Sequence, residues 1–484
     1  MKRFLANLLW LLACLPRWVL FRVALRDPAA AQRRVLARLL RENRNSGFGR
    51  RHRFAAIRTP AEFAASVPLA DYEDFAPAIE QARATGAFSL ASETPLLLEP
   101  TSGTSGSSKL IPATRASRRE FVRAIQPWIA DLFLAHPSLL FGRQYWVVSP
   151  ETPLPESLRG GAIRVGFAAD AEYLGPLGRF AARHVLTPSL QGDPNLRLIS
   201  LWHPSYLAAE TNGFKPDSAA RWPRLKLISC WTDGNSSLWA EHLRKAFQRV
   251  PIQGKGLLAT EGCVTIPFRG RHPCAIRSHY LEFIDAETQA VCGVAELEPG
   301  HVYSVVLTTG AGLWRYRLHD RVRVDGFLAT TPCLAFLGKD NAVSDLVGEK
   351  VSEADAAVAI AEAIRKTGAL PGYAVLVPSP DPDASACGYD AVIDLAGEDD
   401  LVRANVLASF AAAVEASLCA TNFHYRHARA IGQLRGVRAV LRRDARHVHA
   451  PARLRPGVRS GTLKIPALGE SRQSGREPEA GGNT

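Results

Sequence analysis

Hydrophobic residues recur at helical spacing in the first part of the chain. Val35, Leu36, Leu39 and Leu40 would share one face of a helix, so their spacing predicts a helix over residues 28–45. Polar and charged residues occupy the positions between them. We therefore expect an amphipathic helix whose apolar side packs on the rest of the domain.

Two more helices are expected around a first pair of short strands. Asp71 and Gly86 bound one helical pattern, because Asp favours the residue before a helix and Gly favours the residue after it. The apolar runs 94–100 and 109–114 predict buried strands. The stretch 117–135 returns to helical spacing directly after them.

An apolar run opens the chain. It extends from Phe4 to Leu15, which is too short to span a bilayer, and Pro16 and Arg17 interrupt it. We expect residues 1–24 to form a helix that packs on the domain or makes a weak contact with a membrane surface. A signal peptide is the alternative, although no clear small-residue cleavage site follows the run.

Apolar runs and helical stretches then alternate along the middle of the chain. The runs end at turn residues and lie at 144–150, 195–202, 224–231 and 254–260. This alternation predicts an α/β architecture with a partly parallel sheet. From 279 to 327 the pattern changes to strands joined by Gly-containing turns, which predicts β-hairpins.

The chain is long enough for more than one domain. We expect a large domain over residues 1–340, whose first part, 1–45, is helical, and a small α+β domain over 341–466. A hinge is expected within 337–356. Residues 467–484 contain almost no apolar side chain and are expected to form a disordered tail.

Composition excludes some classes of protein. Hydrophobic residues make up 47% of the chain and charged residues 22%, as in a globular protein, and the net charge is +13. The basic residues are mostly arginines spread along the chain, without an aromatic-interleaved stretch or zinc spacing, so we expect no nucleic-acid partner. The eight cysteines form no CxxC pair, which favours reduced thiols and a cytoplasmic location.

A Ser/Gly-rich stretch, TSGTSGSSK at residues 101–109, lies between the two expected short strands. Gly103 and Gly106 let a backbone turn its N–H groups towards an anion, the hydroxyl groups add donors, and Lys109 adds a cation. It does not match a Walker P-loop. A flexible linker is the alternative, but a linker is not expected between two buried strands.

Two acidic residues follow apolar segments further along the chain. Glu261 in LLATEG would end the strand 254–260, where a carboxylate is well placed for a metal ion or a ligand. Asp320 in WRYRLHD would close another strand, where it could accept hydrogen bonds from a ribose or form a salt bridge with Arg317 or Arg321. Alone, each pattern is weak.

Together the three segments resemble a known family. EPTSGTSGSSKLIP at 99–112, LLATEG at 257–262 and YRLHD at 316–320 are similar, in order and spacing, to the three ATP motifs of adenylate-forming enzymes. Among these, the chain most resembles the acyl acid amido synthetases, the auxin-responsive family that conjugates jasmonate or auxin to amino acids. The resemblance covers residues 25–466, and the composition looks like that of a bacterial member.

The resemblance implies a fold and a set of ligands. The fold would be a large adenylate-forming domain of mixed sheets and helices with a small mobile α+β domain after it. The ligands would be ATP and Mg²⁺. The resemblance assigns the ATP phosphates to Thr101, Ser102, Gly103, Thr104, Ser105, Gly106 and Lys109.

The same resemblance assigns the other contacts. Glu261 would bind Mg²⁺, and Thr260 would lie near the α-phosphate. Asp320 would hold the ribose, supported by Tyr316 and Arg317.

Lys350 in GEK and Lys464 in GTLKIP look like the mobile lysines of the family's small domain, which act in catalysis by contacting phosphate. The implied reaction activates a carboxylic acid as an acyl-adenylate with release of pyrophosphate. An amine, expected to be an amino acid, then takes the acyl group and AMP is released. For Lys464, a surface lysine in a frayed tail is the alternative.

Two departures from the family pattern leave other functions open. Leu257 to Thr260 replace an aromatic residue and serines in the second motif, and His319 replaces a glycine in the third. The alternatives are a coenzyme A or other thioester ligase and a catalytically idle nucleotide-binding protein. The sequence does not name the acid, the amine or the oligomeric state.

Overall fold

The structure is a computed structural model, and the chain divides into two units between Lys339 and Asp340. The division lies within the segment that the sequence marks as a hinge, and each unit is described by itself. The residues described are 2–101, 109–146, 160–166, 174–187, 189–190, 193–210, 218–340, 343–369, 371–379, 387–395, 400–441 and 467–469.

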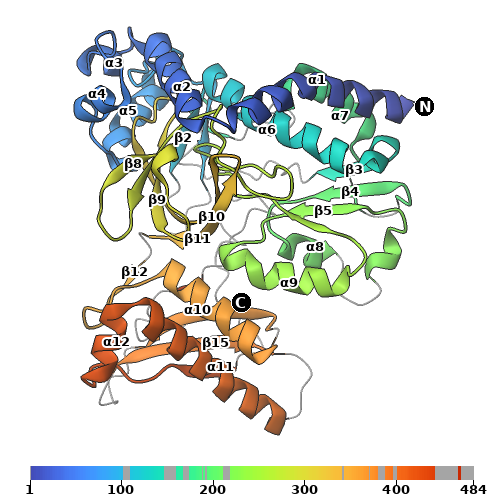
Figure 1. Ribbon diagram of the computed structural model, residues 1–484, viewed down its shortest axis with the longest axis vertical. Helices are drawn as coiled ribbons and strands as arrows, with labels where there is room; N and C mark the ends of the chain where they lie inside the picture. The colour runs from blue at the N-terminus through green and yellow to red at the C-terminus, as the bar shows by residue number, and fades with distance from the viewer. Residues whose placement is uncertain are drawn as a thin grey trace, which may run out of the picture. The chain divides into compact units, whose positions relative to one another are not determined.

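The first unit contains helices α1 to α9 and strands β1 to β11 (Figure 1). Its helices are α1 Lys2–Ala24, α2 Pro28–Asn43, α3 Gly47–Arg51, α4 Pro60–Ser66, α5 Tyr72–Thr85, α6 Arg115–Ala135, α7 Gly175–Val185, α8 Ser205–Glu210 and α9 Ser237–Ala246. Its strands are β1 Leu97–Pro100, β2 Leu110–Ala113, β3 Arg143–Trp146, β4 Leu196–Ser200, β5 Leu227–Cys230, β6 Ile252–Gly254, β7 Tyr280–Asp285, β8 Val291–Gly293, β9 Val302–Thr308, β10 Tyr316–Leu328 and β11 Thr331–Lys339.

The second unit has the expected α+β composition. Its elements are β12 Val343–Ser344, β13 Val351–Ser352, α10 Glu353–Thr367, β14 Tyr373–Ser379, β15 Gly388–Asp394, α11 Asp400–Thr421, α12 Phe423–Ala430 and β16 Arg438–Leu441. β15 lies between an antiparallel partner, β14, and a parallel partner, β16. α10 and α11 pack against each other beside this sheet.

Local signals in the sequence set several of these helix ends. The Asp27 side chain accepts a hydrogen bond from the Ala30 N–H at the start of α2. Asp71 and Asp74 form a capping box at the start of α5, and Gly86 ends that helix with φ 80°, the left-handed conformation that glycine adopts most easily. These helices were predicted from the sequence and are confirmed.

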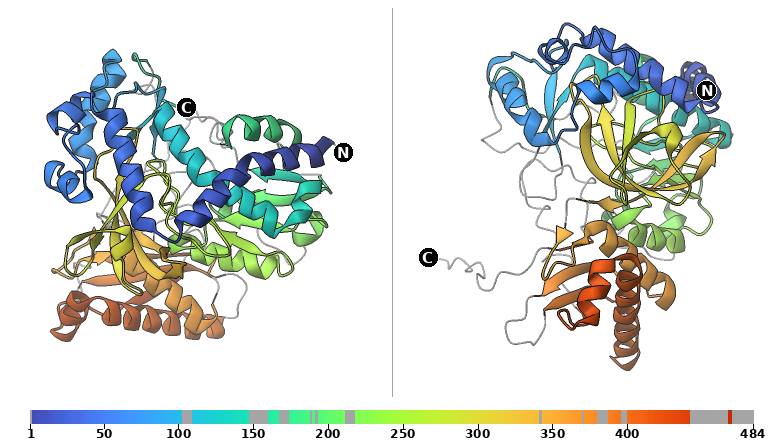
Figure 2. Two further views of the ribbon diagram at one scale, coloured as in Figure 1. Left: turned by 45° about the horizontal axis from the view of Figure 1, so that its top comes forward. Right: turned by 60° about the vertical axis from the view of Figure 1, so that its left-hand side comes forward.

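The helix expected over residues 1–24 is confirmed, and Pro16 lies inside it. α1 continues through Pro16 to Ala24 and buries Trp10 and Cys14 on one side of the proline and Phe21 on the other. Packing of both halves against the same domain offsets the backbone hydrogen bond that proline removes. α1 lies along α6 and α7 (Figure 2).

A buried asparagine of α1, Asn7, fixes the position of this helix. Its Nδ2 lies 3.3, 3.0 and 3.4 Å from the carbonyl oxygens of Leu139, Leu140 and Gly142. Its Oδ1 accepts a hydrogen bond from Gln144 at 3.0 Å. Asn7 therefore has partners for its polar atoms despite complete burial.

Two helices of the described residues meet the length and hydropathy requirements of a membrane span. They are α1 and the segment Ala404–Thr421 of α11, and one third of each is buried within the protein. Length and composition alone are weak evidence, because a core helix of a soluble protein meets the same requirements.

The middle of the first unit is a layered α/β structure, as predicted. β3, β4, β5 and β6 are parallel and adjacent in that order. α1, α6 and α7 lie on one side of this sheet, and α8 and α9 lie on the other (Figure 1). The carboxyl ends of its strands therefore form one edge, the place where ligands bind in open α/β sheets.

The strand expected over 254–260 is placed differently. β6 ends at Gly254, and Gly256 has φ 67°, a conformation that breaks an extended strand. The hairpin-rich stretch forms an antiparallel sheet in the order β11-β10-β9-β7-β8. The Gln32 side chain of α2 bonds to backbone atoms of Ile276, His279 and Leu281, which joins this sheet to the N-terminal helices.

A buried lysine lies at the carboxyl edge of the parallel sheet. Lys255 is 2% exposed, and its Nζ donates a hydrogen bond to Ser200 Oγ at 2.8 Å. The same nitrogen lies 5.1, 5.7 and 4.6 Å from the ring centroids of Trp128, Trp146 and Trp202. These cation–π contacts offset part of the cost of burying the ammonium group.

We expect Lys255→Ala to lower the free energy of unfolding by about 2–4 kcal/mol, because it leaves a cavity between the three tryptophans. Lys255→Met keeps most of the side-chain volume and should cost less than about 1.5 kcal/mol. Urea unfolding followed by tryptophan fluorescence measures both, with Lys245→Ala on the exposed side of α9 as the control. Equal losses for Met and Ala would show that the charge, rather than packing, carries the contribution.

Candidate active site

The Ser/Gly-rich stretch joins two buried antiparallel strands. β1 and β2 pair so that Pro100 faces Leu110, and the Thr101 N–H donates to the Lys109 carbonyl oxygen at 2.8 Å. The stretch is thus a loop between paired strands, as the sequence predicts. The following residues assigned to phosphate lie outside the described residues: Ser102, Gly103, Thr104, Ser105 and Gly106.

Lys109 brings the first motif to the third. Its Nζ lies 3.5 Å from the hydroxyl oxygen of Tyr316, the first residue of β10. It also lies 5.4 Å from the ring centroid of Tyr72 and 5.9 Å from that of Tyr316. The Tyr72 hydroxyl in turn accepts a hydrogen bond from the Leu110 N–H at 2.8 Å. The two tyrosines therefore confine the lysine at the base of the loop.

The second motif is the tip of a tight hairpin rather than the end of a strand. Ala259 and Gly262 exchange backbone hydrogen bonds of 3.0 and 3.2 Å, and Leu258 pairs with Cys263 in antiparallel fashion. Thr260 and Glu261 are the two residues between them. The prediction that Glu261 ends a sheet strand is wrong, because the chain leaves the sheet at Gly254 and turns back on itself.

The third motif is also placed differently from the expectation. Asp320 lies within β10, which begins at Tyr316, and does not close a strand. Its carboxylate is 2% exposed and pairs with Lys339 Nζ at 2.7 Å. Arg317, an expected partner of Asp320, lies 3.6 Å from Asp71 instead.

His319 takes the backbone conformation that a glycine would take. Its φ is 59°, which L-residues rarely adopt, and it lies where β9 and β10 shift register between Arg317 and Arg321. Its Nε2 lies 2.7 Å from Asp71 Oδ1. The histidine therefore adopts a conformation that a glycine at this position would also allow.

The negative charges of Glu261 and Asp320 both act on the side chain of Tyr316. The pKa of Tyr316 is raised first by burial and then by the negative charges of Glu261 and Asp320. Tyr316 therefore stays a neutral phenol. Lys109 of the first motif contacts this tyrosine, and the charges of Glu261 and Asp320, from the second and third motifs, act on it.

The two lysines expected from the small domain are not among the described residues of the first unit. Lys350 belongs to the second unit, is exposed, and has φ 49°. Asn422 Nδ2 donates to its carbonyl oxygen at 3.4 Å. Lys464 lies outside the described residues. The roles of both lysines stay predictions.

Sequence reasoning missed Tyr72 and Lys339. Nothing in DYEDF marks Tyr72 as a neighbour of Lys109, because the contact joins segments from different parts of the fold. Lys339 could have been found, because Leu328 pairs with Thr331 at the β10–β11 turn and Asp320 pairs with Lys339 at the far end. The two register shifts between these pairs cancel, so counting back from the turn gives the correct partner.

A buried charged cluster lies against the hairpin that carries Glu261. A Cβ atom on Gly262 would lie 3.2 Å from His279 Nε2, so the hairpin touches this imidazole. Glu120 lies 3.7 Å from the same nitrogen and 3.6 Å from Arg38, and its oxygens accept the Gly310 N–H at 2.9 and 3.1 Å. The cluster links α2, α6 and the end of β7 beneath the site.

The protonation states in this cluster are unusual. Burial raises the pKa of Glu120 to about 7, although Gly310, Arg38 and Arg123 act against the shift. Burial, Arg38 and Arg123 lower the pKa of His279 to about 3, so this imidazole is neutral at pH 7. Glu120 and His279 therefore lie close together but do not form an ion pair at neutral pH.

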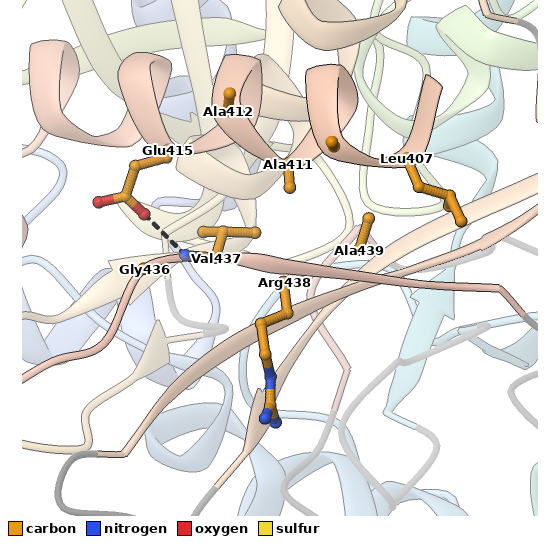
Figure 3. A pocket seen from close by; sticks show the side chains of 9 residues that line it. Leu407, Ala411, Ala412, Glu415, Gly436, Val437, Arg438 and Ala439 are labelled. Carbon is orange, nitrogen blue, oxygen red and sulfur yellow. Dashed lines mark hydrogen bonds between the residues drawn. The ribbon is translucent and has the colours of Figure 1, made fainter. Parts of the chain in front are cut away.

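The second unit contains a groove of about 400 Å³ between α11 and β16 (Figure 3). Its lining is mostly apolar, and Glu415 is held by the Val437 N–H at 2.9 Å and the Tyr425 hydroxyl at 2.8 Å. None of the residues that the sequence singled out lines it. The groove is therefore a weaker candidate for chemistry than the Tyr316 site.

The described residues contain no group of three or more His, Cys, Asp or Glu side chains suited to hold a metal ion. Mg²⁺ is usually held by one or two carboxylates together with substrate phosphates. Glu261, a single half-buried carboxylate at the hairpin tip whose charge acts on Tyr316, fits that mode of binding.

Comparison with known proteins gives a family resemblance in two stretches. Residues 20–157 match the GH3 family N-terminal domain, and residues 273–339 match the GH3 family central domain. A probable indole-3-acetic acid-amido synthetase, GH3.7 of Oryza sativa subsp. japonica, is 28% identical over 166 residues, which are 29% of this chain and 27% of that protein.

A jasmonoyl–L-amino acid synthetase, JAR6 of Nicotiana attenuata, is 26% identical over 199 residues, which are 38% of this chain and 34% of that protein. The chain thus spans about a third or less of these curated relatives. The solved AtGH3.15 acyl acid amido synthetase in complex with 2,4-DB has a TM-score of 0.75 at 18% identity, covering 95% of this chain and 94% of that chain. This likeness confirms the expected fold.

We expect Glu120→Gln to change how stability depends on pH. The raised pKa means that the folded protein keeps a proton that the unfolded chain releases above pH 4.5, so this contribution is present below pH 4.5 and is lost as the pH rises through about 7. Glu120→Gln cannot release a proton at this position, so it does not lose this stability as the pH rises. Its free energy of unfolding, relative to wild type, should therefore increase by about 3 kcal/mol between these pH values.

Urea unfolding at a series of pH values measures the difference. The His279 titration contributes to both proteins and cancels in the comparison. Glu287→Gln, at an exposed position, is the control and should follow wild type. A pH-independent difference for Glu120→Gln would contradict the assigned titration.

Proposed function

We propose that the protein is an ATP-dependent ligase that activates a carboxylic acid as an acyl-adenylate and transfers the acyl group to an amine. The observation that carries the proposal is the contact of Lys109 with Tyr316, which joins the first and third motifs, together with the charges of Glu261 and Asp320 that act on the same tyrosine. The similarity to amido synthetases, in sequence and in fold, supports the same reaction.

In the first half-reaction, a carboxylate oxygen of the acid attacks the α-phosphorus of ATP. An O–P bond forms, the bond to the β-phosphate breaks, and pyrophosphate leaves. Lys109 would stabilise the negative charge on the phosphates, and Glu261 would hold the Mg²⁺ that supplies further positive charge there. This chemistry depends on positioning and on charge stabilisation rather than on a protein nucleophile.

Asp320 would hold the ribose in this proposal. Its pairing with Lys339 orients the carboxylate within a buried environment. Tyr316 and Arg317 would support it from the start of β10. Thr260, next to Glu261 at the hairpin tip, would lie near the α-phosphate.

In the second half-reaction, the amine attacks the activated carbonyl carbon. A C–N bond forms, the C–O bond to AMP breaks, and the amine proton is released. We propose an amino acid as the acceptor, because the relatives are named as amido synthetases and as amino acid synthetases. Lys350 and Lys464 would contact phosphate from a mobile second unit.

We further propose that the acid binds at the carboxyl edge of the β3–β6 sheet. Trp128, Trp146 and Trp202 gather there, and aromatic side chains suit an apolar or aromatic acid. Two finer points rest on the sequence alone: a bacterial origin, from the arginine- and alanine-rich composition, and a cytoplasmic location, from the cysteine usage.

Carboxylate-dependent exchange of labelled pyrophosphate into ATP tests the first half-reaction. We expect exchange with at least one member of a panel of aryl, indole-type and fatty acids. Lys109→Ala and Glu261→Gln should each lower the exchange rate by at least about 100-fold, because each removes a charge contact made in the transition state.

Two exposed residues of the same types provide the controls. Lys245→Ala and Glu287→Gln should exchange at the wild-type rate. Wild-type rates in the Lys109 and Glu261 variants, with unchanged unfolding, would remove the site assignment. If exchange occurs but AMP release requires coenzyme A instead of an amino acid, the thioester ligase becomes the function.

A further inference from the structure

The outer face of α1 carries a continuous apolar row. Leu5, Leu9, Leu12, Val19, Leu20 and Val23 are each between 46% and 60% exposed. Their spacing places all six on one side of the helix. The opposite side is the one that packs on the domain, so α1 is apolar on both sides. An exposed apolar row of this length requires a partner.

Neighbouring elements add exposed apolar side chains to this region. α7, which packs along α1, exposes Leu177 and Phe180. Phe141, in the turn that receives the hydrogen bonds of Asn7, is 59% exposed and stacks on Phe4 at a ring-centroid distance of 5.0 Å. Figure 2 shows α1 and α7 side by side.

The charge of the same elements has one sign. α1 contains four basic residues, Lys2, Arg3, Arg17 and Arg22, and no acidic residue. α7 exposes Arg179 and Arg183 and also has no acidic residue. Within the described residues of α1 and α7, every Asp, Glu, Lys or Arg beside the apolar row is basic, which is the pattern of a helix that lies in the interface of an anionic bilayer.

We propose that the face formed by α1 and α7 docks the protein on the surface of a membrane that contains anionic lipids. The leucines of α1 enter the boundary between headgroups and acyl chains, and the arginines contact lipid phosphates. α1 lies on the membrane and does not cross it. The proposal is independent of the chemistry at Tyr316.

Two observations separate this arrangement from the alternatives. A membrane-spanning α1 would have to abandon the buried bonds of Asn7 and the hydrogen bond from Trp18 Nε1 to Asp131 at 3.1 Å. A second copy seated on the same face would place the basic residues of α1 and α7 against those of its partner, which disfavours a symmetric dimer. An anionic lipid surface satisfies the apolar row and the charges together.

Vesicle flotation of the full chain tests the proposal. We expect binding to phosphatidylcholine vesicles that contain about 30 mol% phosphatidylglycerol, and little binding to phosphatidylcholine alone. Raising the salt from about 50 mM to about 500 mM should release much of the protein, because the charge contribution is screened.

Leu9→Ser/Leu12→Ser should lower the partition coefficient at least about tenfold, because it removes two of the inserting side chains. Arg179→Gln/Arg183→Gln should lower binding to anionic vesicles and leave binding to neutral vesicles unchanged. The matched control is Phe423→Ser/Ile431→Ser, which removes two exposed apolar side chains elsewhere. Circular dichroism and urea unfolding verify that each variant folds.

Three results would overturn the proposal. They are absence of binding to anionic vesicles by the wild type, wild-type binding by Leu9→Ser/Leu12→Ser, and equal loss of binding in the control pair. Sedimentation that shows a dimer abolished by Leu9→Ser/Leu12→Ser would assign the face to a second copy instead.

Discussion

The site depends on the way residues 70–72 attach to the beginning of β10. Ala70 exchanges backbone hydrogen bonds with Arg315 and Arg317 at 3.1 and 2.9 Å. Asp71 contacts His319, and the Tyr72 hydroxyl accepts the N–H of Leu110 in β2. This short segment therefore holds the first and third motifs at once. Without it, Lys109, just before β2, and Tyr316, at the start of β10, would lose this common support.

Much of the architecture follows from local signals in the sequence. Caps and glycines define α2 and α5, apolar runs define the parallel strands, and Ser352 with Asp355 begins α10 with a capping box. The convergence of the three motifs was expected only through a family resemblance. Its physical basis, the attachment of residues 70–72, joins positions about 250 residues apart, and periodicity contains no information about such contacts.

The errors at the site share one cause. An apolar stretch such as residues 254–260 can extend a strand or turn back as a hairpin, and the choice here depends on where the neighbouring strand β5 stops pairing. Similarly, a histidine before Asp320 gives no local sign that it will adopt a positive φ. Its contact with Asp71 accompanies that conformation, so a tertiary contact lets this histidine occupy a position suited to glycine.

The two-residue hairpin at Ala259–Gly262 constrains how this motif can vary over evolution. The carboxylate is positioned by the length of the turn and by the close contact of Gly262 with His279, not by the identities of Leu257 and Leu258, whose side chains are buried in the core. Sequence drift among apolar residues is therefore tolerated before the turn. Insertion or deletion of a single residue would rotate Glu261 away from Tyr316. Divergent homologues should therefore differ in residue identity in this motif but keep the same number of residues in the turn.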